Sequence, residues 1–286
     1  MIFLVPAIVM LIGVSLIPTI YLVNTSFTSW ELSDIYSRVY IGSSNYVELM
    51  RDSRFWHSLG LAFYFMGGTT SLQLLIGLVL AVLLNMKLRG IQLLRSVSVI
   101  PMVLPPVVVG MIWWILYSPT VGPIHYYVNT ILSPFGLRMK PVLAIKQTAM
   151  LGVIASDVWE WTPFITLTLL ATLQSLPREP YESALIDGAS KLQVFGYITL
   201  PMLKPAILLV LLLRAMESMK VFPKIYVMTA GGPGKATETV NYYAFLKGLT
   251  YLEVGYSSAM VVIMFVIIII FSMVLSRFLS RQIMIG

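Results

Sequence analysis

Long apolar runs alternate with shorter polar segments along this chain. Six of the runs approach or exceed the ~20 residues that an α-helix needs to cross the ~30 Å hydrocarbon core of a bilayer. The runs lie at about 2–24, 58–84, 96–117, 148–173, 204–228 and 256–279. This pattern predicts an all-α membrane protein with six transmembrane helices. The first run lacks a basic leader and a cleavage site, so we expect a spanning helix there rather than a signal peptide.

The longest polar interruption inside the second half of the chain is the segment 174–203. Pro177 and Pro180 are expected to end the fourth helix, because proline lacks a backbone donor and disfavours helix in the residue before it. A short helix is predicted over 182–187, and Gly188 can adopt the positive φ that lets a helix stop and the chain turn.

A second helical pattern follows that turn. Leu192, Phe195 and Ile198 recur at a spacing typical of one helix face. Pro201 and Pro205 are then expected to precede the fifth span. The segment as a whole is predicted to form a compact helix–turn–helix at the membrane face.

Composition supports the membrane assignment. Hydrophobic residues make up 58% of the 286 positions and charged residues only 11%, whereas a soluble domain carries roughly a quarter charged residues. The net charge of +7 is explained by Lys and Arg in loops, which set topology and meet lipid head groups. We therefore expect a lipid bilayer, and no nucleic acid, as a partner. The lack of cysteine excludes disulfides and thiolate metal sites.

The distribution of basic residues predicts an orientation. The short loop at 85–95 and the C-terminal tail are basic and contain no acidic residue, and such segments favour the cytoplasmic side. We expect both termini and the 174–203 loop in the cytoplasm. Because the chain begins directly on an apolar run, we also expect a short cytoplasmic leader to be missing from its start.

The 174–203 segment carries a long gapped motif, E-x-A-x3-G-x9-I-x-L-P. It is matched in full by Glu182, Ala184, Gly188, Ile198, Leu200 and Pro201. Here the sequence resembles the membrane subunits of binding-protein-dependent ABC importers, whose EAA motif forms the loop that docks on a cytoplasmic ATPase. Ser183 stands where that family usually has a second alanine, and serine is small enough to pack closely there.

The resemblance continues outside this loop. The stretch 222–229, followed by Gly231-Gly232-Pro233 and Thr237, is similar to the carbohydrate branch, the maltose- and trehalose-type permeases. Around the third span the similar positions are Pro101, Pro105, Trp113, Gly122 and Asn129.

The resemblance implies one transmembrane permease domain over 1–286 in a bacterial or archaeal cell (inner) membrane. It would form half of a translocation path that works by alternating access. The implied partners are a second permease subunit (as a heterodimer), two ATPase subunits and an extracytoplasmic solute-binding protein. ATP and Mg would be bound by the ATPase subunits; this chain has no G-x4-G-K-[ST] loop and would bind no cofactor. The implied ATPase-coupling residues are Glu182, Ser183, Ala184, Asp187 and Gly188.

Ionisable side chains inside membrane spans are costly and usually face a bundle interior or a wet cavity. Acidic residues fall in the fourth run and several charged residues in the fifth, and the family resemblance places solute contacts in the same two helices. The predicted solute-path residues are Glu160, Trp161, Phe164, Arg214, Glu217 and Ser218. The alternative is an internal ion pair of Glu160 or Glu217 with Arg214 that only fixes packing.

Two further alternatives concern function. A sugar is the solute that the resemblance implies, but a charged polyol such as glycerol phosphate is the rival, because Arg214, Lys220 and Lys224 could meet a phosphate. A passive channel or assembly scaffold fits the spans equally well, but gives the 174–203 loop no purpose. An intramembrane enzyme lacks a plausible set of catalytic residues, since both histidines fall in loops or at span ends.

Overall fold

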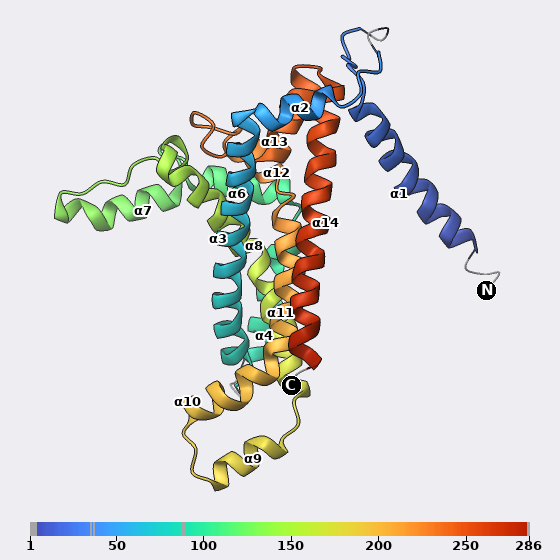
Figure 1. The fold of residues 1–286 in the computed structure, drawn as a ribbon. Helices are drawn as coiled ribbons and strands as arrows, with labels where there is room; N and C mark the ends of the chain where they lie inside the picture. Colours follow the sequence, from blue (N-terminus) through green and yellow to red (C-terminus); the bar gives the residue numbers. More distant parts are fainter. Residues whose placement is uncertain (1–4, 35, 37, 87–89, 285–286) are drawn as a thin grey trace. The chain divides into compact units, whose positions relative to one another are not determined.

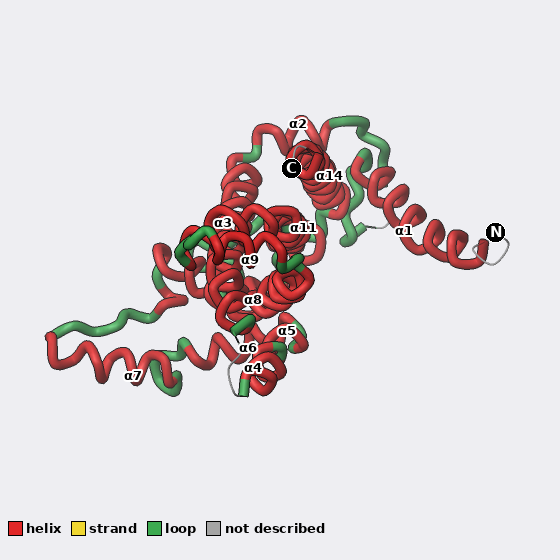
Figure 2. Tube along the Cα trace, turned by 90° about the horizontal axis from the view of Figure 1, so that it is seen from below, coloured by secondary structure: helices red, strands yellow, loops and turns green. Residues whose placement is uncertain are grey.

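The computed structural model describes residues 5–34, 36, 38–86 and 90–284. These residues form helices joined by turns and loops, and within these ranges only isolated bridges, and no strand, are present (Figure 2). The all-α prediction is thus confirmed for the described chain. Contacts divide it into two compact units, Met1–Leu61 with Glu238–Phe271, and Ala62–Thr237 with Ser272–Gly286.

The first unit is held together by a polar network at the start of α3. It comprises α1 (Val5–Ser26), α2 (Ser44–Arg51), the beginning of α3 (Ser53–Leu84), α13 (Val240–Phe245) and most of α14 (Val254–Met284) (Figure 1). The Asp52 carboxylate accepts hydrogen bonds from the hydroxyls of Tyr243 (2.7 Å) and Tyr256 (2.9 Å). Arg54 donates two hydrogen bonds to Glu238, at 2.6 and 2.8 Å. These contacts fix the junction between α2 and α3 against α13 and α14.

The second unit is a helical bundle with two appendages. It contains the rest of α3, α4 (Ile91–Ser98), α5 (Ile100–Val103), α6 (Pro106–Leu116), α7 (Pro123–Leu132), α8 (Lys146–Ser175), α9 (Glu179–Ile186), α10 (Lys191–Val194), α11 (Leu200–Ser218) and α12 (Pro223–Met228). Ala81 of α3, Ile165 and Leu169 of α8 and Val210 of α11 are fully buried together, so these three helices form the core. The α9–α10 hairpin lies beyond one end of them, and α7 projects away (Figure 1).

Length and composition support four membrane spans, and a fifth if one bent helix pair counts as a span. The four are Ile8–Ser26, Ser53–Leu84, Lys191–Ser218 and Val254–Arg277. Helix α8 has 30 residues, enough to cross a bilayer, but it is too polar to meet the same criterion. The six-span arrangement therefore stays a prediction. Residues 2–4 of the first predicted run lie outside the described residues.

The apolar run at 96–117 is helical but sharply bent. Two helical segments, Ile91–Val103 and Pro106–Leu116, meet there at 99°. Leu104 and Pro105 each precede a proline and are extended, with ψ of 139° and 140°. The residue before proline avoids the helical region and proline cannot donate to a helix, so the Pro105-Pro106 pair forces the bend.

The span predicted at 204–228 is wrong at both ends. Helical structure runs from Lys191 to Ser218, because a π-helical turn at Phe195–Thr199 leads directly into α11. Pro201 lies inside this continuous helical segment, directly after the π-helical turn, and its missing N–H leaves one backbone bond of the segment unmade. After Ser218 the helix breaks, and α12 begins at Pro223, with four residues between them.

Candidate solute path and coupling loop

The reversal between α9 and α10 is built on local sequence. Gly188 has φ +73°, a left-handed conformation that side chains other than glycine's seldom adopt. The N–H of Ala189 donates to the carbonyl of Ala184 at 2.9 Å, which closes the end of α9. Ser190 and Gln193 then cap α10 reciprocally, with side-chain to backbone bonds of 2.8 and 3.4 Å. Each residue that makes the turn is therefore close in sequence to its partner.

The hairpin presents an apolar surface that this chain leaves uncovered. Leu185, Ile186, Leu192 and Tyr197 are 70%, 87%, 84% and 82% exposed. Exposed apolar groups that cluster in this way are typical of interaction surfaces. Four of the predicted coupling residues are exposed on the same hairpin and Ala184 is half-buried; the four are Glu182, Ser183, Asp187 and Gly188.

The hairpin is joined to the bundle by one uninterrupted helical segment. From Lys191 the backbone stays helical through the π-helical turn and α11 to Ser218. The hydroxyl of Tyr181 on α9 also donates to Thr199 Oγ1 at 3.2 Å. A cavity of about 650 Å³ lies between the hairpin and the ends of α3 and α8. Movement of the hairpin would thus be carried along α11 toward the bundle interior.

A buried polar cluster lies where α3, α8, α11 and α12 meet, and Asp157 is its centre. Arg214 donates to Asp157 Oδ2 at 3.0 Å, and the Gln73 amide donates to the same oxygen at 2.9 Å. Arg214 also donates to Gln73 Oε1 at 3.1 Å. Lys224 forms ion pairs with both Asp157 and Glu160. One carboxylate thus connects the helices on both sides of the break after Ser218.

The cluster is electrically balanced. Two acidic residues, Asp157 and Glu160, face two basic residues, Arg214 and Lys224, and all four are at most 5% exposed. Removing a charge from water costs several kcal/mol unless a partner and further hydrogen bonds compensate it. Among the described residues neither oxygen of Glu160 accepts a well-formed hydrogen bond, so its close approach to Lys224 is its main compensation.

The alternative prediction, an ion pair of Arg214 with Glu160 or Glu217, named the wrong acidic residues. Arg214 pairs with Asp157, Glu160 pairs with Lys224, and Glu217 pairs with Lys220 at 2.8 Å on the exposed surface. The helix geometry explains the difference for Glu217. Glu217 and Ser218 lie on opposite sides of the helix face that carries Arg214. Ser218 lies on the buried side, and Glu217 lies on the exposed side.

The predicted solute-path residues separate into three environments. Trp161, Arg214, Glu217 and Ser218 border one cavity of about 150 Å³, with the Arg214 guanidinium 4.5 Å from the centre of the Trp161 ring. Glu160 lies deeper and does not line this cavity. Phe164 packs against the apolar core of the second unit, with its ring edge-on to Trp161 at 6.4 Å.

Three residues of the cluster were missing from the predicted set: Asp157, Lys224 and Gln73. Asp157 and Lys224 had the same signal as the residues that were chosen, an ionisable group in an apolar run. Gln73 had a weaker one, since it is the only amide side chain in the run 58–84. A polar group placed in an apolar helix has to find a partner inside the protein.

Comparisons with known proteins agree with this architecture. Residues 73–285 match the family described as "binding-protein-dependent transport system inner membrane component". The chain is 38% identical over 261 residues to the probable ABC transporter permease protein y4oQ of Sinorhizobium fredii, covering 90% of this chain and 82% of that protein. It is 36% identical over 244 residues to the trehalose/maltose transport system permease protein MalF of Thermococcus litoralis, covering 85% and 81%.

A solved structure shares the fold. A chain in the crystal structure of a bacterial alginate ABC transporter, in complex with a pentasaccharide-bound periplasmic protein, superposes with a TM-score of 0.83. The match covers 98% of this chain and 93% of the other, at 22% sequence identity. At that identity the likeness speaks for the fold alone.

Proposed function

Since the chain belongs to the family of binding-protein-dependent transport system inner membrane components, we propose that it forms half of the membrane path of an ATP-driven sugar importer. The chain is a transport component and not a catalyst. Its proposed partners are a second permease subunit, two ATPase subunits that bind ATP and Mg, and an extracytoplasmic solute-binding protein. Family membership argues against the passive channel and the intramembrane enzyme.

The observation that carries this proposal is the helical connection between the exposed hairpin and the buried cluster. An ATPase that closes on Ile186 and Leu192 would displace the α9–α10 hairpin, and α11 would carry the displacement to Arg214. The cluster joins α11 to α3, α8 and α12, so it can respond only by moving these helices together or by exchanging partners. Rocking between two such arrangements is the alternating access expected of a transporter.

The proposed orientation places both termini and the α9–α10 hairpin in the cytoplasm. The exposed apolar surface of the hairpin supports this, because ATPase subunits are cytoplasmic and that surface needs a protein partner. The basic loop at 85–95 supports it independently. The membrane is that of a bacterial or archaeal cell.

A sugar is favoured over glycerol phosphate by the charge balance. Arg214 and Lys224 are neutralised by Asp157 and Glu160, and Lys220 is paired with Glu217. The cluster therefore presents hydrogen-bonding groups and an aromatic ring, Trp161, without excess positive charge for a phosphate. Sugars are bound through such groups. The relative from Thermococcus litoralis, named for trehalose and maltose, supports the same choice.

Uptake by the complete importer, reconstituted in vesicles with its partner subunits and binding protein, tests the proposal. ATP-dependent uptake of a radiolabelled sugar from a panel of mono-, di- and oligosaccharides is expected, with little uptake of glycerol phosphate. Trp161→Leu should reduce sugar uptake. The matched control is Trp159→Leu, because Trp159 lies on the same helix but lines a separate apolar cavity. Uptake that needs no ATP, or that is restricted to glycerol phosphate, would refute the proposal.

A further inference from the structure

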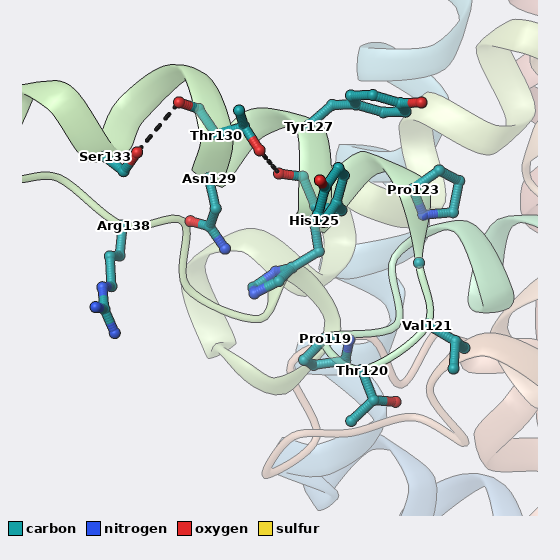
Figure 3. Close-up of a pocket in the computed structure, with 12 residues that line it drawn as sticks. Pro119, Thr120, Val121, Pro123, His125, Tyr127, Asn129, Thr130, Ser133 and Arg138 are labelled. Carbon is teal, nitrogen blue, oxygen red and sulfur yellow. Dashed lines mark hydrogen bonds between the residues drawn. The ribbon is translucent and has the colours of Figure 1, made fainter.

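The segment between α6 and α8 folds into a hairpin that lines a further cavity, open to the surface. Its walls are α7, the turn at 119–122 and Arg138 on the returning chain, and its volume is about 710 Å³ (Figure 3). This volume lies in the range of about 300–1,000 Å³ that is typical of small-molecule sites. The cavity is distinct from the buried cluster and shares no lining residue with it.

Local sequence fixes the shape of this hairpin. A Cβ at Gly122 would lie 2.4 Å from the carbonyl oxygen of Ser118, so only glycine allows the tight turn into α7. At the other end Gly136 reverses the chain. The side-chain oxygen of Asn129 then accepts a 2.6 Å hydrogen bond from the backbone N–H of Met139. The returning segment is thereby held beside α7, and Arg138 is held at the rim of the cavity.

The cavity offers at least two donors to a ligand, the guanidinium of Arg138 and the amide NH2 of Asn129. His125 and Asn129 are one helical turn apart, and Figure 3 shows both on the same side of α7 as Arg138. The oxygen of the Asn129 amide is already occupied, which leaves its NH2 group to donate. The buried Nδ1 of His125 has no hydrogen-bond partner among the described residues. Buried polar atoms without partners are uncommon and often mark a bound water, ion or ligand.

Charge and aromatic rings define the chemical class of the ligand. Arg138 is the one Lys, Arg, Asp or Glu among the described residues that line the cavity, and the segment 118–147 contains no acidic residue, so the charge at the cavity is positive. Tyr126 and Tyr127 line it and are largely exposed, offering flat apolar faces of the kind that cover sugar rings. A guanidinium and an amide donor in one place suit an oxyanion.

We propose that this cavity binds a small acidic saccharide, with its carboxylate or phosphate on Arg138 and Asn129 and its ring against Tyr126. Binding at this cavity is separate from the buried cluster, because the two sites share no lining residue. It therefore does not depend on which solute crosses the membrane through the buried cluster.

Binding to the complete importer in nanodiscs of uncharged lipid, without ATP or binding protein, tests this inference. Calorimetric titration with glucuronate should show saturable binding, and glucose, which lacks the carboxylate, should bind at least ~10-fold more weakly. Arg138→Gln should weaken glucuronate binding by about 10-fold or more, since a hydrogen bond to a charged group is worth that much. Asn129→Asp keeps the acceptor for Met139 but puts a carboxylate in place of the donor, so it should weaken binding at least as strongly.

The matched control is Lys140→Gln. It removes the same charge two residues from Arg138, at an exposed position that does not line the cavity, and should change glucuronate affinity less than ~2-fold. Equal effects of Lys140→Gln and Arg138→Gln would overturn the inference in favour of a diffuse charge effect. Absence of glucuronate binding in the uncharged nanodiscs would overturn the inference. In that case, Arg138-dependent enrichment of anionic lipid around the importer, measured separately in nanodiscs that mix neutral and anionic lipid, would assign the cavity to a lipid head group instead. ATP-driven uptake is measured separately, so failure here leaves the proposed function standing.

Discussion

Replacing Asp157 by asparagine tests whether the buried cluster is a single electrostatic unit. Asn keeps the size of the side chain but removes the charge that Arg214 and Lys224 share. Glu160 then remains the only acidic residue in the cluster, against two buried cations. Breaking a buried ion pair by removing one partner costs about 3–5 kcal/mol. For chains of this size each kcal/mol lowers the melting temperature by roughly 2–4 °C, so a fall of about 6–20 °C is expected.

The assay is thermal unfolding of the purified complex in detergent, followed by intrinsic fluorescence. Glu217→Gln is the matched control, because it breaks the exposed pair with Lys220, which is worth about 0–1 kcal/mol. The double variant Asp157→Asn/Arg214→Gln restores electroneutrality and keeps the pair of Lys224 with Glu160. It should be less destabilised than the two single changes added together, by about 0.5–3 kcal/mol.

Two results would contradict this reasoning. If Asp157→Asn lowered the melting temperature no more than Glu217→Gln, Asp157 would not be the centre of a coupled network. If the double variant were as unstable as the sum of its parts, the charges would act separately, and the cluster could not link movement of α11 to α12.

Three further predictions concern the hairpin and the first unit. Gly188→Val should abolish ATP-driven uptake, because a β-branched residue is strained at φ +73°. Gly196→Val, at a helical glycine with open space around it, should be tolerated. Normal uptake by Gly188→Val would refute the turn geometry. Glu182→Arg reverses an exposed charge on α9 and should weaken co-purification of the ATPase subunits, and unchanged association with normal coupling would remove that role. The pKa of Asp52 lies below its usual value. Burial by itself would raise this pKa, but hydrogen bonds from two tyrosine hydroxyls and two backbone amides together outweigh the effect of burial. The ionised Asp52 therefore stabilises the fold at pH values above its unfolded pKa of about 3.9, and this stabilisation is lost as the pH falls through the lower folded pKa. Hydrogen exchange at the α2–α3 junction should accelerate below about pH 4. Asp52→Asn should remove this pH dependence.

The sequence was informative wherever the physical cause is local. The apolar runs at 58–84 and 256–279 are helical in the structure because their length and composition require backbone bonds to be made within the segment. Gly188 could be identified as a turn because its conformational freedom is a property of the residue itself. The bend at Pro105-Pro106 had an equally local signal, but the surrounding apolar run concealed it.

The partners of the buried charges were beyond sequence reasoning. Asp157, Glu160 and Glu217 are all acidic residues within reach of Arg214 by composition and approximate depth, and one-dimensional spacing does not rank them. Which one pairs depends on the rotation of α8 and α11 about their axes and on the break after Ser218, which brings Lys224 back toward Asp157. Gln73 enters only because α3 packs against α8.

What the sequence by itself determined is the class of protein, the helical hairpin with its turn at Gly188, and the family to which the motif points. Each of these depends on residue chemistry and on neighbours a few positions apart. What only the tertiary structure decided is which helices share the charges and where cavities form. Those features depend on contacts between residues far apart in the chain, such as Gln73 with Asp157 and Arg214, and on which face each helix turns inward.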